Sequence, residues 1–227
     1  MKILAIIPAR GGSKGLPNKN IREFFGKPLI CWTIDAARGI LQDEDICVST
    51  DSVEIRDIVE SYGLKVPFLR PKNLASDTAS TRDVIIHTLN YYKNLNRKYD
   101  IVLLLQPTSP LRTSTHIKQA LSLYSNQLDM VVSVKISHAV AVLAEENTEG
   151  YLNLIYNENG LRRQDITRYY EYNGAIYIIN VNSIQQNSSL NFKKKIKYVM
   201  NEMESVDIDN LFDFEFAEII YKNIRKR

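Results

Sequence analysis

Three cationic side chains lie close together in a glycine-rich segment near the start of the 227-residue sequence. Arg10, Lys14 and Lys19 belong to the stretch PARGGSKGLPNKN, which follows directly on the apolar run Ile3–Ile7. The glycines of this stretch let the backbone turn tightly and expose its N–H groups. Several cationic groups around such a concavity suit a triphosphate better than an uncharged ligand. The segment therefore predicts a cradle for a nucleotide.

Two well-known phosphate-binding loops do not account for this segment. A Walker A loop requires a lysine followed by serine or threonine, whereas Lys14 precedes Gly15 and Lys19 precedes Asn20. The dinucleotide fingerprint requires G-x-G-x-x-G and an immediate helix, and Pro17 with its polar neighbours delays any helix here. A glycine-rich turn can also be a simple connection between elements, but the cluster of cations favours the cradle.

Two carboxylates near the end of the chain form a second candidate site. Asp207 and Asp209 are separated by one residue, so in extended backbone they share one side while Ile208 points to the other. Paired carboxylate oxygens suit Mg²⁺, which could also hold substrate phosphates. The alternative is that Asp209 or Asn210 simply caps the last helix. Beside a triphosphate cradle, metal binding is the preferred hypothesis.

The elements that must position these residues alternate along the first two thirds of the chain. Apolar runs rich in valine, isoleucine and leucine are typical of parallel strands buried on both faces. The predicted strands are Ile3–Ile7, Ile46–Ser49, Val66–Leu69, Ile101–Leu105, Met130–Val134, Gly174–Ile179 and Ile196–Met200. The predicted helices are Leu29–Arg38, Val53–Tyr62, Thr81–Tyr92 and Thr115–Tyr124, with a last helix from about Leu211. Asp51 is expected to cap the second helix and Gly63 to end it. This order predicts an α/β fold with an open doubly wound, mostly parallel sheet.

Polar groups follow each of the first four predicted strands. They are the cationic loop, Ser49–Asp51, Arg70 with the segment Ala75–Thr81, and Gln106 with the segment Pro107–Arg112. Ligands of open parallel sheets bind outside the carboxyl ends of the strands, so we expect these groups to line one crevice. The Gln106 amide offers both a donor and an acceptor there. The alternative is a proline-containing turn that merely ends the strand.

The alternation breaks between about residues 136 and 172. The stretch Ser137–Glu149 shows no helical period, Tyr151–Asn157 alternates like a strand, and a turn at Gly160 is expected. We interpret residues 1–227 as a single domain from which this segment makes an excursion. Such an excursion would cover a site or contact another subunit.

Composition excludes several classes of protein. The net charge of +3 is small and the basic residues form no stripe, so we expect a small anionic ligand and no nucleic acid. No apolar stretch is long enough to span a membrane, and no signal peptide is apparent. Cys31 and Cys47 are expected to be buried free thiols, which favours a reducing, cytoplasmic location. The three histidines are far apart, so a zinc site is not expected.

Seven segments together resemble the acylneuraminate cytidylyltransferases, which make CMP-activated sialic acids and related nine-carbon acidic sugars. The segments are IPARGGSKGLPNKN, VSTD, LRPKNLASDTAST, LLLQPTSPLRT, RRQD, NGAIYI and SVDID, and they occur in the family's order. The resemblance implies a nucleotide-diphospho-sugar transferase-like fold whose excursion helps to form a homodimer. It also implies transfer of CMP from CTP to the anomeric hydroxyl of N-acetylneuraminic acid or a related nonulosonic acid, with release of pyrophosphate.

The same resemblance implies roles for individual residues. Arg10, Ser13, Lys14, Lys19 and Asn20, with the backbone from Gly12 to Gly15, would hold the CTP phosphates. Arg70, Ala79 and Thr81 would border the cytosine and ribose. Gln106, Arg163, Asn173 and Tyr177 would address the acidic sugar, with Arg163 acting in its own or a partner subunit's site. Asp207 and Asp209 would bind Mg²⁺. As a hypothesis on the mechanism, we expect Arg10, Lys19 and Asp209 to be catalytic, with Asp209 accepting a proton directly or through a metal-bound water.

One segment departs from the family pattern. The stretch Ala139–Ala144 reads AVAVLA, and no basic residue occurs between Lys135 and Arg162, where family members often carry a residue that supports the sugar carboxylate. Legionaminic acid or another nonulosonic acid therefore stays open as the substrate. A nucleotidyltransferase for another nucleotide and a non-catalytic nucleotide-binding module are the remaining alternatives.

Overall fold

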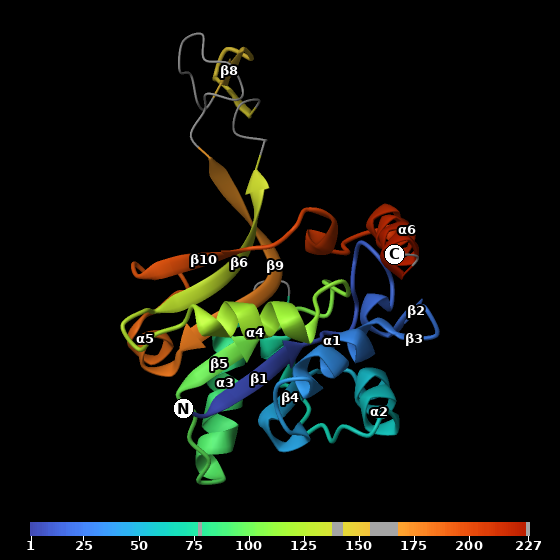
Figure 1. The fold of residues 1–227 in the computed structure, drawn as a ribbon, viewed down its shortest axis with the longest axis vertical. Helices are drawn as coiled ribbons and strands as arrows, with labels where there is room; N and C mark the ends of the chain where they lie inside the picture. The colour runs from blue at the N-terminus through green and yellow to red at the C-terminus, as the bar shows by residue number, and fades with distance from the viewer. Residues whose placement is uncertain (77–78, 138–142, 155–167, 226–227) are drawn as a thin grey trace.

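A six-stranded sheet forms the centre of the protein in a computed structural model, which describes residues 1–76, 79–137, 143–154 and 168–225 (Figure 1). The strands are β1 (Ile3–Pro8), β4 (Ile46–Ser49), β5 (Ile101–Leu104), β6 (Met130–Ser137), β9 (Tyr169–Asn180) and β10 (Lys195–Val199). Their order is β10-β6-β9-β5-β1-β4. All pairings are parallel except those of β9, which runs antiparallel to β5 and β6. The prediction of a mostly parallel α/β sheet is confirmed.

Helices cover both faces of this sheet. They are α1 (Leu29–Arg38), α2 (Val53–Ser61), α3 (Thr81–Asn94), α4 (Ser114–Ser122), α5 (Val181–Gln186) and α6 (Leu211–Arg225). Helices α1, α2 and α4 pack on the face that carries Ala5 and Ile7, and α3 and α5 pack on the face that carries Leu4 and Ile6. Side chains of β1 alternate between the two cores because successive strand residues point to opposite faces. The sheet is therefore doubly wound, as predicted.

Helix α6 packs outside these two cores. Ile208 and Phe214 form a third small core with Leu16 and Phe24 from the N-terminal segment. The hairpin of β2 (Glu23–Phe24) and β3 (Lys27–Pro28) carries Phe24, whose ring meets the Phe214 ring edge-on at 5.6 Å. This core joins the two ends of the chain, so the cationic loop and the segment before α6 become neighbours.

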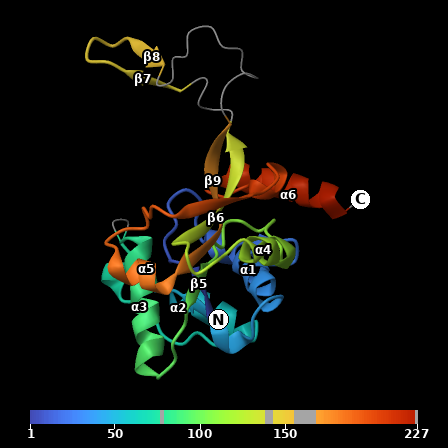
Figure 2. The same cartoon turned by 60° about the vertical axis from the view of Figure 1, so that its left-hand side comes forward.

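The excursion leaves the sheet where β6 and β9 run on as a two-stranded ribbon (Figures 1 and 2). Strands β7 (Ala144–Glu146) and β8 (Leu152–Leu154) pair with each other and not with the central sheet. The strand expected at Tyr151–Asn157 thus agrees with β8 as far as it is described. The rest of the excursion, with the predicted turn at Gly160, lies outside the described residues.

Two local expectations are wrong. Val66–Leu69 is not a strand; only an isolated bridge joins Leu69 to Thr50, and the Val66 N–H donates to Glu60 Oε1 at 3.3 Å instead of extending a ladder to β4. Ser52, not Asp51, caps α2 by accepting a hydrogen bond from the Ile55 N–H at 3.3 Å. The Asp51 carboxylate instead accepts from the Gly11 N–H.

Other expectations on local structure hold. Gly63 follows the end of α2 with φ of +84°, a left-handed conformation that glycine adopts without strain. Cys31 and Cys47 are buried and free. None of the described helices combines the length and the apolar composition that a membrane span requires.

Candidate active site

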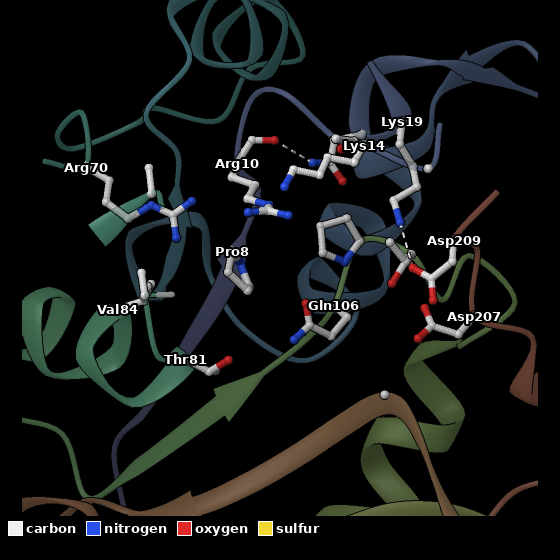
Figure 3. A pocket seen from close by; sticks show the side chains of 18 of the residues that line it. Pro8, Arg10, Lys14, Lys19, Arg70, Thr81, Val84, Gln106, Asp207 and Asp209 are labelled. Atoms are coloured by element: carbon white, nitrogen blue, oxygen red, sulfur yellow. Dashed lines mark hydrogen bonds and ion pairs between the residues drawn. The ribbon is translucent and has the colours of Figure 1, made fainter. Parts of the chain in front are cut away.

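A cavity of about 640 Å³ opens where β1 and β5 end at the carboxyl edge of the sheet (Figure 3). Its lining includes Arg10, Ser13, Lys14, Gly15, Lys19, Asn20, Arg70, Ala79, Thr81, Gln106, Tyr177, Asp207 and Asp209. The predicted crevice therefore exists, although Ser49–Asp51, which were also expected there, do not line it. Residues up to 201 positions apart in sequence meet in it. Arg70 and Thr81 lie toward one end and the two aspartates toward the other, with Arg10 and Lys14 between them.

Hydrogen bonds hold the cationic loop in shape at the mouth of β1. The buried Asn20 side chain donates from Nδ2 to the Arg10 carbonyl oxygen at 3.1 Å. The Gly11 N–H donates to Asp51 Oδ1 at 3.0 Å, which ties the loop to the end of β4. These contacts use backbone and amide groups, and the cationic side chains of the loop line the cavity.

Lys19 joins the loop to the carboxylate segment. Its Nζ donates to the Ile208 carbonyl oxygen at 2.6 Å and to Asp209 Oδ1 at 3.0 Å. The Lys19 side chain is 12% exposed, whereas that of Asp209 is 78% exposed. Asp209 therefore keeps oxygen atoms open to the cavity although it pairs with Lys19.

The alternation expected around Ile208 is present. Ile208 is fully buried in the third core, and its N–H donates to the Thr108 carbonyl oxygen at 2.9 Å. Asp207 and Asp209 face the cavity instead. The capping alternative applies to Asn210, whose Oδ1 accepts from the Asp213 N–H at 3.1 Å, and not to the Asp209 carboxylate.

The electrostatic setting of Asp207 disfavours its charged form. Asp207 is exposed to the open cavity, but the protein around its carboxyl takes the place of part of the solvent, and this desolvation raises its pKa above the ordinary value. The nearby Asp209 charge raises the pKa further, while a hydrogen bond with Thr108 opposes both effects. The Tyr177 hydroxyl also has a raised pKa, from burial and then from Asp207. A cation between the two carboxylates would relieve this repulsion.

The donor set fits a hard divalent cation such as Mg²⁺. Two carboxylates supply oxygen ligands, and in the described part of the chain no group of three metal-ligating side chains is found. Mg²⁺ commonly takes one or two carboxylates and completes its shell with phosphate oxygens and water. Asp207 and Asp209 therefore suit a site that is completed by substrate.

Arg70 places a guanidinium with unsatisfied nitrogens at the end of the cavity opposite the two aspartates. Its side chain is 5% exposed, and the nearest carboxylate oxygen, Asp51 Oδ1, lies 3.9 Å from Nη2. Nε and Nη2 are buried without a hydrogen-bond partner among the described residues. Burial is the main cause of its lowered pKa, and Arg70 in turn lowers the pKa of His87, whose own burial has the larger effect. A ligand oxygen or ring nitrogen would satisfy these donors.

Among the described residues, two that were predicted for the site are not part of this lining. Gly12 borders a smaller adjoining cavity of about 100 Å³, which Arg10 and Asn20 also border. Asn173 is buried, and its amide pairs with the Ser133 and Ser205 hydroxyls at 2.6 and 2.9 Å, so it serves the fold instead of the cavity. Arg163 lies outside the described residues.

Two lining residues beside Asp207 had no individual role in the sequence analysis, where Thr108 was expected only as part of the segment Pro107–Arg112. Gly174 and Thr108 line the cavity beside Asp207. Gly174 has φ of +74°, and a Cβ there would lie 3.1 Å from Asp207 Oδ2. The glycine in the segment NGAIYI could have indicated this close approach from the sequence, because a glycine within a strand often marks a place where another group comes near the backbone.

A family model described as cytidylyltransferase matches residues 4–224 of this sequence. The chain belongs to the cytidylyltransferase family. Among its relatives is an N-acylneuraminate cytidylyltransferase of Escherichia coli, which is 39% identical over all of this chain and 56% of that protein. A CMP-N,N'-diacetyllegionaminic acid synthase of Legionella pneumophila is 39% identical over 96% of this chain and 95% of that protein. A pseudaminic acid cytidylyltransferase of Campylobacter jejuni is 34% identical over 98% and 97%.

These comparisons confirm the resemblance to the acylneuraminate cytidylyltransferases. The chain spans about half the length of the first of these relatives and nearly the whole length of the other two. Solved structures support the fold of the family. A CMP-2-keto-3-deoxy-manno-octonic acid synthetase complexed with CTP superimposes with a TM-score of 0.71 at 19% identity, covering 99% of this chain and all of the other. A 4-diphosphocytidyl-2C-methyl-D-erythritol synthase from Anaerococcus prevotii gives 0.64 at 15%, covering 97% and 98%.

Proposed function

We propose that this protein transfers CMP from CTP to the anomeric hydroxyl of an acidic nine-carbon sugar and releases pyrophosphate. The observation that carries the proposal is the facing arrangement of Lys19 and the two carboxylates Asp207 and Asp209 in one cavity with Arg10 and Lys14. Cations suit the triphosphate, and the carboxylates suit a metal ion and a hydroxyl that must lose a proton. The family of the chain supports the choice of CTP.

The arrangement along the cavity gives CTP one orientation. The cytosine and ribose lie toward Arg70, Ala79 and Thr81, and the phosphates lie past Arg10 toward Lys19. The unsatisfied nitrogens of Arg70 supply hydrogen-bond donors to the base end. With this orientation the α-phosphorus faces Gln106 and the carboxylates, where the sugar enters.

Charge stabilisation carries most of the proposed catalysis. The anomeric hydroxyl attacks the α-phosphorus in line, and the charge that spreads over the phosphate oxygens meets Arg10 and Lys19. The backbone from Gly12 to Gly15, with Ser13, Lys14 and Asn20, receives the leaving pyrophosphate. Asp209 accepts the proton of the attacking hydroxyl, because its carboxylate is open to the cavity. Asp207 and Asp209 would hold Mg²⁺, which when bound neutralises phosphate charge.

The sugar would lie against Gln106 and Tyr177, which line the cavity together with Gly174. The names of the relatives include N-acylneuraminate, diacetyllegionaminic and pseudaminic acid enzymes, so each of these acids is a candidate substrate. We include Arg163 as a further sugar-binding residue. Asn173 contributes by shaping the strand beside Gly174, since its amide is used by Ser133 and Ser205.

We also propose that the active form is a cytoplasmic homodimer in which the excursion contacts the partner. The exposed residues of the β7–β8 hairpin, among them Tyr151 and Leu152 at 66% and 75% exposure, support a contact surface there. Sedimentation of the chain against the Tyr151→Ser, Leu152→Ser double variant tests this proposal. A wild type that sediments as a monomer at the concentrations of the activity assay contradicts it.

A panel of nucleotides and sugars tests the function. Purified protein with Mg²⁺ is offered CTP, UTP, ATP or GTP together with N-acetylneuraminic, legionaminic or pseudaminic acid, and pyrophosphate release is measured. We expect release with CTP and one or more of the acids, and none after EDTA is added. Binding of CTP without release with any acid would instead support a non-catalytic nucleotide-binding module. Release with a neutral sugar or another nucleotide would replace the proposed substrate.

A further inference from the structure

Arg112 is a fully enclosed cation directly behind the cavity. It is 2% exposed, and no carboxylate oxygen lies within 4.0 Å of it among the described residues. Burial lowers the pKa of its guanidinium to about 9. A buried charge without a partner ion is costly, and an apolar side chain of similar volume at such a place is often neutral or stabilising. A role in stability alone therefore does not account for an arginine here.

The guanidinium instead connects three separate elements. Nη1 donates to the Gln106 carbonyl oxygen at 3.0 Å and to the Ala175 carbonyl oxygen at 3.2 Å. Nη2 donates to Thr33 Oγ1 at 2.6 Å. The loop after β5 is thereby fastened to strand β9 and to helix α1. The planar fork of arginine makes this possible, because its donors point in fixed directions toward several acceptors at once.

Two of the three groups that accept hydrogen bonds from Arg112 belong to residues in the cavity lining or next to it. Gln106 lines the cavity, and Ala175 follows Gly174, whose backbone passes so close to Asp207 Oδ2 that a Cβ would lie 3.1 Å away. The same loop also holds the carboxylate segment, since the Thr108 carbonyl oxygen accepts from the Ile208 N–H at 2.9 Å. Displacement of this loop would therefore move Gln106 relative to Asp207.

We propose that Arg112 is a positioning residue, which fixes Gln106 and the Gly174 backbone at the distance from Asp207 that the reaction requires. This inference rests on the proposed function for its kinetic consequence. The rigid placement of the loop against Asp207 does not depend on that function. Arg112 itself does not line the cavity and touches no substrate.

Arg112→Met and Arg112→Lys test the kinetic consequence, with Arg82→Met as the matched control. Arg82 also donates to backbone carbonyls, those of Ile184 and Asn187 at the end of α5, and its own side chain does not line the cavity. We expect Arg112→Met to lower kcat about 100-fold because reacting groups are misplaced by a fraction of an ångström. The Kd for CTP should change by less than about threefold, because the cations that hold phosphate lie on another loop. Arg112→Lys keeps the charge but lacks the planar fork of the guanidinium, so its kcat should lie between those of the wild type and Arg112→Met.

A double-mutant cycle separates positioning from a general loss of structure. If Arg112 acts through Gln106, the Arg112→Met, Gln106→Ala double variant should have about the same kcat as the more impaired single variant. Multiplied losses would overturn the proposal, as would a kcat of Arg112→Met within twofold of wild type. A kcat of Arg82→Met as low as that of Arg112→Met would also overturn it.

Amide hydrogen exchange provides a measurement that needs no activity. In Arg112→Lys, which conserves the charge and volume, the Ile208 N–H should exchange about tenfold faster, while amides of α3 keep wild-type rates. Unchanged exchange at Ile208 would overturn the inference. If the wild type releases no pyrophosphate with any sugar, the proposed function fails and the exchange result still decides the placement of the loop. If the wild type is active and Ile208 exchange is unchanged, only the inference fails.

Discussion

Gly15 and Asp209 are in backbone contact although 194 positions separate them in the sequence: a Cβ on Gly15 would lie 2.4 Å from the Asp209 carbonyl oxygen. The cationic loop and the carboxylate segment are therefore packed against each other directly, and Lys19 fastens the same junction through Ile208 and Asp209. The spacing between positive and negative groups in the cavity is set by this contact. Glycine is required at position 15 by the close approach of another part of the chain.

Gly15→Ala should separate the two segments. A methyl group cannot occupy a point 2.4 Å from a backbone oxygen, so the loop or the carboxylate segment must shift. We expect kcat/KM to fall about 100-fold, as misplacement of reacting groups does. The control is Gly26→Ala, where φ is +81° and nothing lies within 4 Å of a Cβ. That variant should lose stability, by roughly 1 kcal/mol, without loss of kcat. Equal activity of Gly15→Ala and wild type would show that the contact does not set the site.

Lys19→Ala should lose most of kcat while the protein stays folded. The ammonium that we propose faces the CTP phosphates disappears, and Asp209 loses its partner at 3.0 Å. We expect a decrease of about 10²–10³-fold in kcat, the usual effect of removing a preorganised charge from a transition state. Lys27→Ala is the control, because Lys27 pairs with Asp35 and covers the Trp32 ring outside the cavity. Steady-state kinetics on both variants measures kcat, and circular dichroism shows whether they are folded. Near-normal turnover of Lys19→Ala removes Lys19 from its assigned role.

Asp207 should make activity and stability respond to pH in opposite directions. Burial and the charge of Asp209 raise its pKa in the folded state, so the folded protein holds this proton more tightly than the unfolded chain does. Stability from this group is present at low pH and is lost as pH rises through the window between the ordinary and the raised pKa. Activity rises over the same window, because the charged carboxylate is the form that binds a cation.

Asp207→Asn removes the titrating group and tests the predicted direction of the change in stability with pH. The unfolding temperature of the variant relative to wild type should increase as the pH rises from the ordinary pKa of aspartate, about 4, through the raised pKa of Asp207, and the variant should be inactive. Added Mg²⁺ should raise the unfolding temperature of the wild type more than that of the variant. Thermal unfolding of both proteins across this pH range, with and without Mg²⁺, measures the effect. A difference that is constant with pH would contradict the assigned setting of Asp207.

Arg70→Met should weaken CTP binding without weakening the fold. The guanidinium is buried with two nitrogens that lack partners among the described residues, so the free protein gains little from it. We expect the Kd for CTP to rise about 10- to 100-fold, which corresponds to about 1.4–2.8 kcal/mol, and the unfolding temperature to be equal or higher. Arg56→Met is the control, since Arg56 pairs with Asp57 on the surface of α2. Calorimetric titration with CTP measures the Kd of both variants, and thermal unfolding measures their stability. An unchanged Kd of Arg70→Met would exclude Arg70 from the nucleotide site.

Local patterns in the sequence predict much of this fold. The helix at Leu29–Arg38 has the bounds that its apolar period indicates, and β1, β4 and β5 lie where runs of branched apolar residues occur. The reason is that burial on one or both faces imposes a period on nearby residues. Features that depend on distant partners escape this reasoning. The Val66 N–H bonds to the Glu60 side chain, so the expected third strand is reduced to one bridge, and β9 turns out to be antiparallel and longer than the segment Gly174–Ile179.

The same division applies to the site. The sequence by itself determined the chemistry: a glycine-rich cationic loop behind a buried strand, a pair of aspartates one residue apart, and polar groups at the ends of strands. Only the tertiary structure decided which of these groups meet. It placed Asp209 against Gly15, left the Arg70 nitrogens without partners, and enclosed Asn173 among hydroxyls away from the cavity. Residue type fixes charge and hydrogen-bonding capacity, whereas distance, burial and orientation arise only when segments far apart in the chain pack together.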